Sequence, residues 1–133
     1  MRYVIAALCL SIAACSTTPV ARDEAASSEI HWAETQIARD GTGTLTITRD
    51  SGLYGAACRH TVTINGTRAA TMRPGTTASF HLAPGEYLVL VEFGRGLCPN
   101  VALSQDVQIV VGQTRSYRVL LPSDGAARLV RVE

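Results

Sequence analysis

The sequence predicts an all-β fold, a small antiparallel β-sandwich of about seven or eight short strands. From Gly41 onward, apolar and polar residues alternate with a period of two, as they do in half-buried strands. Glycine, proline and asparagine turns separate these segments at intervals of roughly 8–12 residues, the spacing typical of sandwiches and small barrels. The segment Tyr87–Val91 is almost continuously apolar, which indicates a central strand covered on both sides. Such a strand needs a second layer over it, and this favours a sandwich over a barrel.

Residues 1–14 have the pattern of a lipoprotein signal peptide. Arg2 supplies a positive charge, and the apolar run Tyr3–Ile12 is too short for a permanent membrane span, which needs about 20 residues. Ile12–Cys15 resembles the bacterial lipobox, in which small residues admit the signal peptidase and the cysteine thiol receives a diacylglycerol group. The resemblance implies that Cys15 is lipidated and that the rest of the chain lies outside the cytoplasm, attached to a membrane. The alternative is an ordinary secretory signal with an incidental cysteine at its cleavage site.

The segment 15–40 is expected to be a flexible, lipidated tether, because it is rich in alanine, serine, threonine and charged residues. Ser16 stands where an aspartate is the usual signal for retention in the inner membrane, and this pattern implies an outer-membrane protein that faces the periplasm. Helical spacing after Ser28 allows a short helix over Glu29–Arg39. Trp32, the only tryptophan, is expected to dock this segment on the domain, with an exposed partner contact as the alternative.

Residues 41–133 are expected to form the sandwich. Thr44–Thr48 alternates so cleanly that its leucine and isoleucine must share the buried face of the first strand. Cys58–Ile64 is the second strand and meets Asn65-Gly66, a strong hairpin signal because both residues tolerate positive φ. Proline and glycine turns then separate further strands, which are expected at Thr67–Met72, Thr77–Leu82, Glu86–Phe93, Gln105–Val111, Gln113–Leu121 and Ala127–Val132.

The balance of charge argues against nucleic-acid binding. Of the 12 basic residues, Arg2 belongs to the signal peptide, and the others equal the 11 acidic residues in number, so the mature chain has no net formal charge. All of the basic residues are arginines, a bias that fits a GC-rich genome better than a set of anion-binding groups.

Cys58 and Cys98 are expected to form a disulfide. Cys9 leaves with the signal peptide and Cys15 takes the lipid, so these two cysteines remain as a pair in an oxidising compartment. Neither belongs to a C-x-x-C motif, which argues against a metal or redox site. Closing a loop of this length should stabilise the fold by roughly 4 kcal/mol in the chain-entropy model.

Several turn and strand motifs resemble those of PEGA-like domains and related small bacterial lipoproteins. The similarity lies in a hairpin, a "PGEY" turn and an apolar strand, carried here by Val62–Gly66, Phe80–Tyr87 and Val89–Val91. It covers about residues 44–119 and includes the turn at Met72–Gly75. The resemblance implies an immunoglobulin-like or prealbumin-like sandwich of the cell envelope, with no catalytic residues to transfer.

No catalytic residue, metal site or cofactor is expected. His31, His60 and His81 are the only histidines, and no His-x-His or His-x-x-x-His spacing joins any two of them. Strand parity predicts that His60 faces inward or lies at the edge of the core, and that His81 faces solvent. Glu86 and Glu92 lie on one strand roughly 20 Å apart, too far for glycosidase chemistry, and are expected to be surface charges. The sequence also lacks a Gly-x-Ser-x-Gly motif and a phosphate-binding glycine loop, so the protein is not expected to be an enzyme.

The sequence leaves two classes of function. The favoured class is a non-catalytic binding or assembly module of the envelope, whose partner is a protein or a glycan. Tyr54, Arg95 and Leu97 are candidate contacts, because they offer an aromatic ring, a guanidinium and an apolar side chain beside the disulfide. Ordinary solvated loops are the alternative for these residues. The second class is a periplasmic inhibitor of an enzyme such as lysozyme, since small disulfide-bearing β lipoproteins include such inhibitors.

Overall fold

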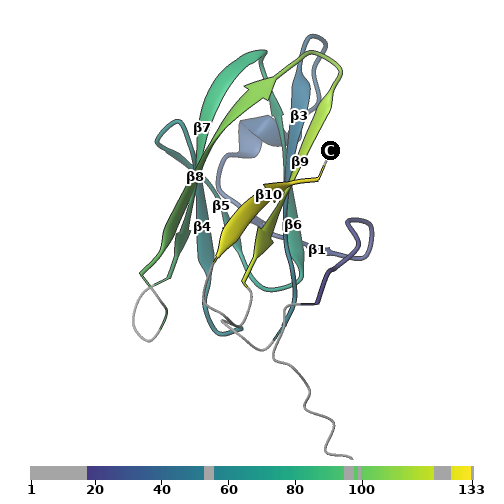
Figure 1. Cartoon of the computed structure of the whole chain (residues 1–133). Helices are drawn as coiled ribbons and strands as arrows, with labels where there is room; N and C mark the ends of the chain where they lie inside the picture. The colour runs from purple at the N-terminus through teal and green to yellow at the C-terminus, as the bar shows by residue number, and fades with distance from the viewer. Residues whose placement is uncertain (1–17, 53–55, 95–97, 99, 122–126, 133) are drawn as a thin grey trace, which may run out of the picture.

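The computed structural model describes residues 18–52, 56–94, 98, 100–121 and 127–132, which form two β-sheets packed face to face (Figure 1). The first sheet has the strand order β1-β6-β3-β9-β10 and the second has the order β2-β5-β4-β7-β8. The all-β sandwich predicted from the sequence is therefore confirmed. The elements are β1 (Ala26–Ser27), β2 (Glu29–Ile30), the 3-10 helix η1 (Ala33–Gln36), β3 (Gly43–Arg49), β4 (His60–Ile64), β5 (Thr67–Met72), β6 (Thr76–Leu82), β7 (Gly85–Phe93), β8 (Ala102–Ile109), β9 (Thr114–Leu120) and β10 (Arg128–Arg131).

The strands β3 to β10 match the segments predicted from the alternation of apolar and polar residues. β8 is the main difference in boundaries, because it begins at Ala102 rather than at Gln105. The hairpin turn between β4 and β5 is also confirmed, since Asn65 and Gly66 have φ values of 46° and 78°. Within the described residues, no helix is long and apolar enough to cross a membrane.

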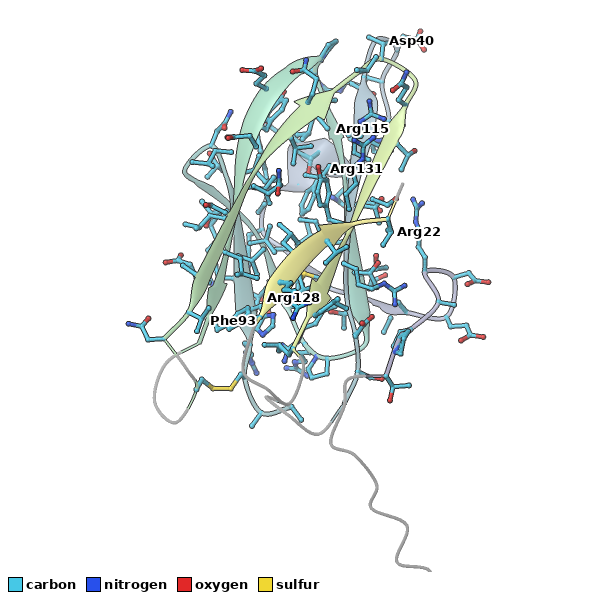
Figure 2. All side chains as sticks on the ribbon, in the orientation of Figure 1. Arg22, Asp40, Phe93, Arg115, Arg128 and Arg131 are labelled. Carbon is cyan, nitrogen blue, oxygen red and sulfur yellow. A yellow bond between two sulfur atoms is a disulfide. The ribbon has the colours of Figure 1, made fainter. Side chains whose placement is uncertain are left out.

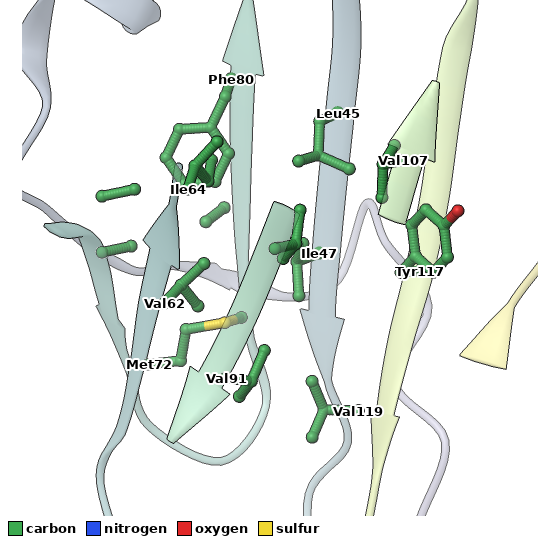
Figure 3. Close-up of a cluster of buried hydrophobic side chains, with 14 of the residues drawn as sticks. Leu45, Ile47, Val62, Ile64, Met72, Phe80, Val91, Val107, Tyr117 and Val119 are labelled. Atoms are coloured by element: carbon green, nitrogen blue, oxygen red, sulfur yellow. The ribbon is translucent and has the colours of Figure 1, made fainter. Parts of the chain in front are cut away.

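The hydrophobic core lies between the sheets and is formed by the inward faces of both (Figure 3). Leu45 and Ile47 of β3 share the buried face, as predicted. Burying a large apolar side chain stabilises the fold by about 1.5–3 kcal/mol relative to leaving it exposed. The large apolar side chains that are completely buried include Leu45, Ile47, Val62, Ile64, Met72, Phe80 and Val91.

The expectation that the strand at Tyr87–Val91 is covered on both sides is wrong. β7 is central in its sheet, because it is hydrogen-bonded to β4 and β8. Its burial nevertheless alternates, with Val89 and Val91 in the core and Leu88 49% exposed. Each sheet of a two-layer antiparallel sandwich has one face toward solvent. The apolar run therefore places a leucine on the outer surface instead of marking a covered strand.

From Thr18 onward, the chain joins the sandwich, which differs from the flexible tether expected over residues 15–40. Thr18 forms a β-bridge with Ser51, β1 pairs in parallel with β6, and β2 pairs antiparallel with β5. An edge strand exposes unpaired backbone N–H and C=O groups, and the two short strands β1 and β2 satisfy such groups on one edge of each sheet. Only Cys15, Ser16 and Thr17 of the expected tether precede this attachment.

The helix expected over Glu29–Arg39 is reduced to the four-residue 3-10 helix η1, and β2 occupies the start of that range. Ser28 does not cap the helix, because η1 begins at Ala33 with Trp32 at the N-cap position. The Ser28 hydroxyl instead donates a hydrogen bond to Thr76 Oγ1 at 3.0 Å. Trp32 is partly buried and packs against the core. This contact agrees with the prediction that Trp32 docks the segment on the domain.

Cys58 and Cys98 form the predicted disulfide, with 5.7 Å between their Cα atoms (Figure 2). The bond lies at the end of the sandwich where β3, β5, β7 and β9 finish, and we call this end the disulfide end. At the opposite end, Asn65-Gly66 joins β4 to β5 within the second sheet, and Ala83-Pro84 leads from β6 of the first sheet to β7 of the second; we call it the hairpin end.

Candidate functional site

A polar groove with a volume of about 810 Å³ follows the outer face of β4, in the second sheet. It extends from the disulfide end, where Cys98 and Asn100 line it, to the Gly66 turn at the hairpin end. The described residues that line the groove are Thr61, Thr63, Gly66, Arg68, Glu92, Phe93, Gly94, Cys98 and Asn100.

The alternation of β4 places two threonines in the groove. Val62 and Ile64 are completely buried in the core, so Thr61 and Thr63 point to the outer face of the sheet. The neighbouring strands supply a charge opposite each threonine, because Thr61 pairs with Glu92 of β7 and Thr63 pairs with Arg68 of β5. The groove therefore presents two hydroxyls between a guanidinium and a carboxylate.

The groove is chemically polar along its length. Arg68 donates a hydrogen bond to Thr71 Oγ1 at 3.2 Å, and His31 Nε2 is hydrogen-bonded to the same oxygen at 2.8 Å. Phe93 is the only large apolar side chain among the described lining residues, and it is only 5% exposed. Apolar small molecules bind in pockets lined mostly by apolar and aromatic side chains. This lining instead suits a partner that brings its own hydrogen-bonding groups.

The residues predicted as partner contacts, Tyr54, Arg95 and Leu97, lie outside the described residues, and so does the lipidation site Cys15. Gly94 and Cys98, which flank residues 95–97 in the sequence, line the groove. The sequence patterns did not identify Thr61, Thr63 and Arg68 as site residues. Their only signal was strand alternation, which places them on an outer face without distinguishing a groove from ordinary solvated surface.

The three histidines stand apart in different surroundings. His60 is completely buried, which confirms its predicted inward orientation. His81 is partly exposed, and its Nδ1 is hydrogen-bonded to Thr44 Oγ1 at 3.2 Å. Within the described residues, no three His, Cys, Asp or Glu side chains come together in an arrangement that could hold a metal ion. Glu86 and Glu92 are both exposed, as expected of surface charges.

A buried arginine lies beside His60 at the disulfide end. Arg49 is 1% exposed, and it donates hydrogen bonds to the backbone carbonyls of Cys58 and Met72. Burial lowers the pKa of Arg49 to about 10, so the side chain remains charged at neutral pH. Burial also lowers the pKa of His60 to about 3, with a further contribution from the charge of Arg49. A neutral imidazole enclosed in this way is a part of the core and is not accessible to a substrate.

The outer face of the first sheet holds a second polar cluster under the N-terminal segment. Arg118 donates to Asp50 Oδ1 at 2.7 Å and to the Val20 carbonyl at 3.1 Å, so one guanidinium joins β9 to two other parts of the chain. Arg22 donates to Thr46 Oγ1 at 3.0 Å. A small pocket of about 230 Å³ lies between these groups. The hydrogen bonds hold residues 20–22 against the sheet.

No protein-family model, no curated protein and no solved structure matches this chain. The polar groove along β4 and the pattern of residues 1–15 are the features that bear on function.

Proposed function

We propose that this protein is a lipid-anchored, non-catalytic binding or assembly module of the bacterial envelope, held at the outer membrane and facing the periplasm. The observation that carries the binding part of the proposal is the polar groove along the outer face of β4. The partner is a periplasmic protein segment or a glycan, because both present many hydrogen-bonding groups along an extended shape.

Anchoring is supported by the leader and by the cysteines. The short apolar run, the lipobox-like Ile12–Cys15 and the serine at position 16 fit export followed by lipidation. The Cys58–Cys98 disulfide also fits an oxidising compartment such as the periplasm. Several acyl chains on one cysteine would make the attachment effectively permanent, whereas one chain binds only marginally.

The residues that line the groove support a non-catalytic role. Its described lining residues include one guanidinium and one carboxylate, Arg68 and Glu92, with threonine hydroxyls between them. The described residues that line the groove include none of the three histidines. Threonine without a neighbouring base is a weak nucleophile. The groove is thus suited to binding, in agreement with the resemblance to PEGA-like domains.

Crosslinking in intact cells tests this proposal. A photo-reactive amino acid placed at Thr61 should capture a specific envelope component, and Thr63→Arg should abolish the capture by filling the groove. Gln108→Arg is the matched control, because Gln108 is exposed on β8 of the same sheet and does not line the groove. Equal capture in both variants would contradict binding in the groove.

A lysozyme activity assay with the purified protein tests the alternative function. Nanomolar inhibition of lysozymes would favour the inhibitor hypothesis over the binding module. Mass spectrometry of the native protein tests the anchor, since a mature N-terminus at Cys15 carrying acyl groups is expected.

A further inference from the structure

The chain between the proposed lipid and the folded domain is very short. Thr18 forms reciprocal backbone hydrogen bonds with Ser51, from Thr18 N to Ser51 O at 2.7 Å and from Ser51 N to Thr18 O at 3.1 Å. Only Ser16 and Thr17 separate Thr18 from Cys15. Three residues of fully extended chain reach at most about 11 Å. A lipidated Cys15 would therefore hold Ser51 within about this distance of the bilayer surface.

The attachment of Thr18 is reinforced by the residues that follow it. The carbonyl of Val20 accepts a hydrogen bond from Arg118, and Arg22 donates one to Thr46. Strand β1 then pairs with the beginning of β6. Lengthening the tether would first require the Thr18–Ser51 bridge to open, and any further extension would break the later contacts in turn, so the folded attachment restricts movement of the domain away from the membrane.

Ser51 lies at the disulfide end of the sandwich, two residues after the end of β3. The Thr76 end of β6 meets the same region, because Gly75 N donates to the Arg49 carbonyl at 3.0 Å. β7 is nine residues long, which corresponds to about 30 Å at 3.3 Å per residue. The reach of the tether is about a third of this length. The disulfide end must then face the bilayer, and the hairpin end must point away from it.

The disulfide end carries exposed positive charge. Arg59, immediately before β4, and Arg73, immediately after β5, are both exposed, and neither belongs to an ion pair within the described residues. Arg128 lies at this end as well, because it begins β10 and pairs with Leu120 at the end of β9. Among the described carboxylates near this end, Glu92 and Glu29 are exposed, and Asp50 is buried against Arg118. Glu92 and Glu29 pair with Thr61 and Thr71, which lie two residues further from this end than Arg59 and Arg73. The two arginines are therefore closer to the tip of the sandwich than these carboxylates.

We propose that the disulfide end is a membrane-docking surface, with Arg59 and Arg73 against anionic lipid headgroups. This inference rests on the proposed lipid anchor at Cys15 and adds an orientation to it. Arginine near a negatively charged lipid surface is attracted over about one Debye length, which is about 8 Å at physiological ionic strength. The short tether keeps the disulfide end at a distance from the headgroups that is comparable to this Debye length. The polar groove, which opens at Asn100, would then receive its partner beside the membrane surface.

The orientation can be measured on the full lipidated protein in vesicles of phosphatidylethanolamine and phosphatidylglycerol. A fluorescent amino acid is incorporated at Ala57 or at Ala83, two exposed alanines at the disulfide end and at the hairpin end. Lipids with a quencher on the headgroup should quench the label at position 57 strongly and the label at position 83 weakly. Equal quenching at both positions, on protein whose acylation is verified by mass spectrometry, would overturn the inference.

Measuring the acylation of Cys15 distinguishes a failure of this orientation from a failure of the proposed lipid anchor. An unmodified Cys15 would overturn the anchor, and the orientation with it, whereas acylated protein without a preferred orientation would overturn the orientation alone. A flexible insertion of about 12 glycine and serine residues after Thr17 provides a second test of the surface itself. With this longer tether, the difference in quenching should persist at low salt and disappear in Arg59→Gln/Arg73→Gln, since each arginine changes the population of the docked state by about fivefold. If the difference in quenching persists in that double variant, these arginines do not form the docking surface.

Discussion

The imidazole ring of His60 lies stacked on the ring of Phe93, with 4.1 Å between the ring centroids and 21° between the ring planes. Neither ring nitrogen of His60 has a hydrogen-bond partner among the described residues, and the side chain is completely buried. Buried polar atoms are nearly always hydrogen-bonded, so this histidine is an exception that lowers the stability of the fold. It occupies the core as an aromatic ring and remains neutral there.

The first prediction concerns the pH dependence of stability. The pKa of His60 is lowered by burial from 6.5 to about 3. Between these two pH values the unfolded chain binds a proton that the folded protein does not, so the free energy of unfolding falls as the pH falls. At pH 5, the buried His60 should lower the free energy of unfolding by about 2 kcal/mol relative to its value at pH 7. Urea unfolding at a series of pH values measures this slope.

The matched variants are His60→Phe and Phe93→Leu. His60→Phe removes the titrating group and keeps an aromatic ring, so its stability should vary less with pH by about the same 2 kcal/mol. Phe93→Leu removes the stacking partner but retains the buried histidine, so the slope should remain. An unchanged slope in His60→Phe would show that other groups cause the acid sensitivity.

The second prediction concerns the disulfide. Cys58 and Cys98 are separated by 40 positions in the sequence, and opening a loop of this length should cost about 4 kcal/mol in the chain-entropy model. Thermal unfolding with and without a reductant should show this loss. The double variant Cys58→Ala/Cys98→Ala should be destabilised to a similar degree and should not respond to reductant. A wild-type protein that is equally stable when reduced would contradict the prediction.

The strands and the disulfide could be predicted because each depends on a local or pairwise pattern. Alternation of residues such as Leu45 and Ile47 reports which face of a strand is buried. The cysteine pair was predicted because the expected signal peptide and lipidation would leave only these two cysteines. The coverage of β7 could not be read from Tyr87–Val91, because a continuous apolar run does not say whether a second layer lies on one side or on both.

The N-terminal attachment and the groove could not be predicted. β1 and β2 are only two residues long, too short to show any period. Their pairing depends on the open edges of the sheets, which exist only after the sandwich has formed. Arg49 is a charged residue at the end of a strand, and no sequence pattern marked its burial or its contacts with the carbonyls of Cys58 and Met72.

The third prediction concerns Ser116 of β9. Its hydroxyl is buried and has no hydrogen-bond partner among the described residues, although Ser116 pairs with Thr46 in the neighbouring strand. Removing an unsatisfied buried hydroxyl also removes its desolvation penalty, so Ser116→Ala should leave the free energy of unfolding unchanged or raise it by up to about 1 kcal/mol. Thr46→Val is the matched control. That change deletes the acceptor of the Arg22 hydrogen bond and should destabilise the protein by about 1 kcal/mol.

The fourth prediction concerns the buried ion pair between Asp50 and Arg118. The Asp50 side chain is 1% exposed and the Arg118 side chain is 22% exposed, with 2.7 Å between Arg118 Nη1 and Asp50 Oδ1. Burial raises the pKa of Asp50, and Arg118 opposes this shift. Arg118→Gln removes the opposing charge, so the pKa of Asp50 should rise further. The variant should lose about 3 kcal/mol of stability at neutral pH, because it leaves a buried carboxylate without its cation.

The sign of the pH dependence distinguishes this loss from simple loss of packing. A carboxyl group whose pKa is raised in the folded state stabilises the fold only when it is protonated, and that contribution is lost as the pH rises above the folded pKa. Arg118→Gln should therefore be closest to the wild type in acid and furthest from it at neutral pH. In Asp50→Asn/Arg118→Gln this difference should disappear, since no carboxyl group remains to titrate. A deficit of the same size at every pH would instead indicate that Arg118 acts through its hydrogen bond to the Val20 carbonyl and through packing.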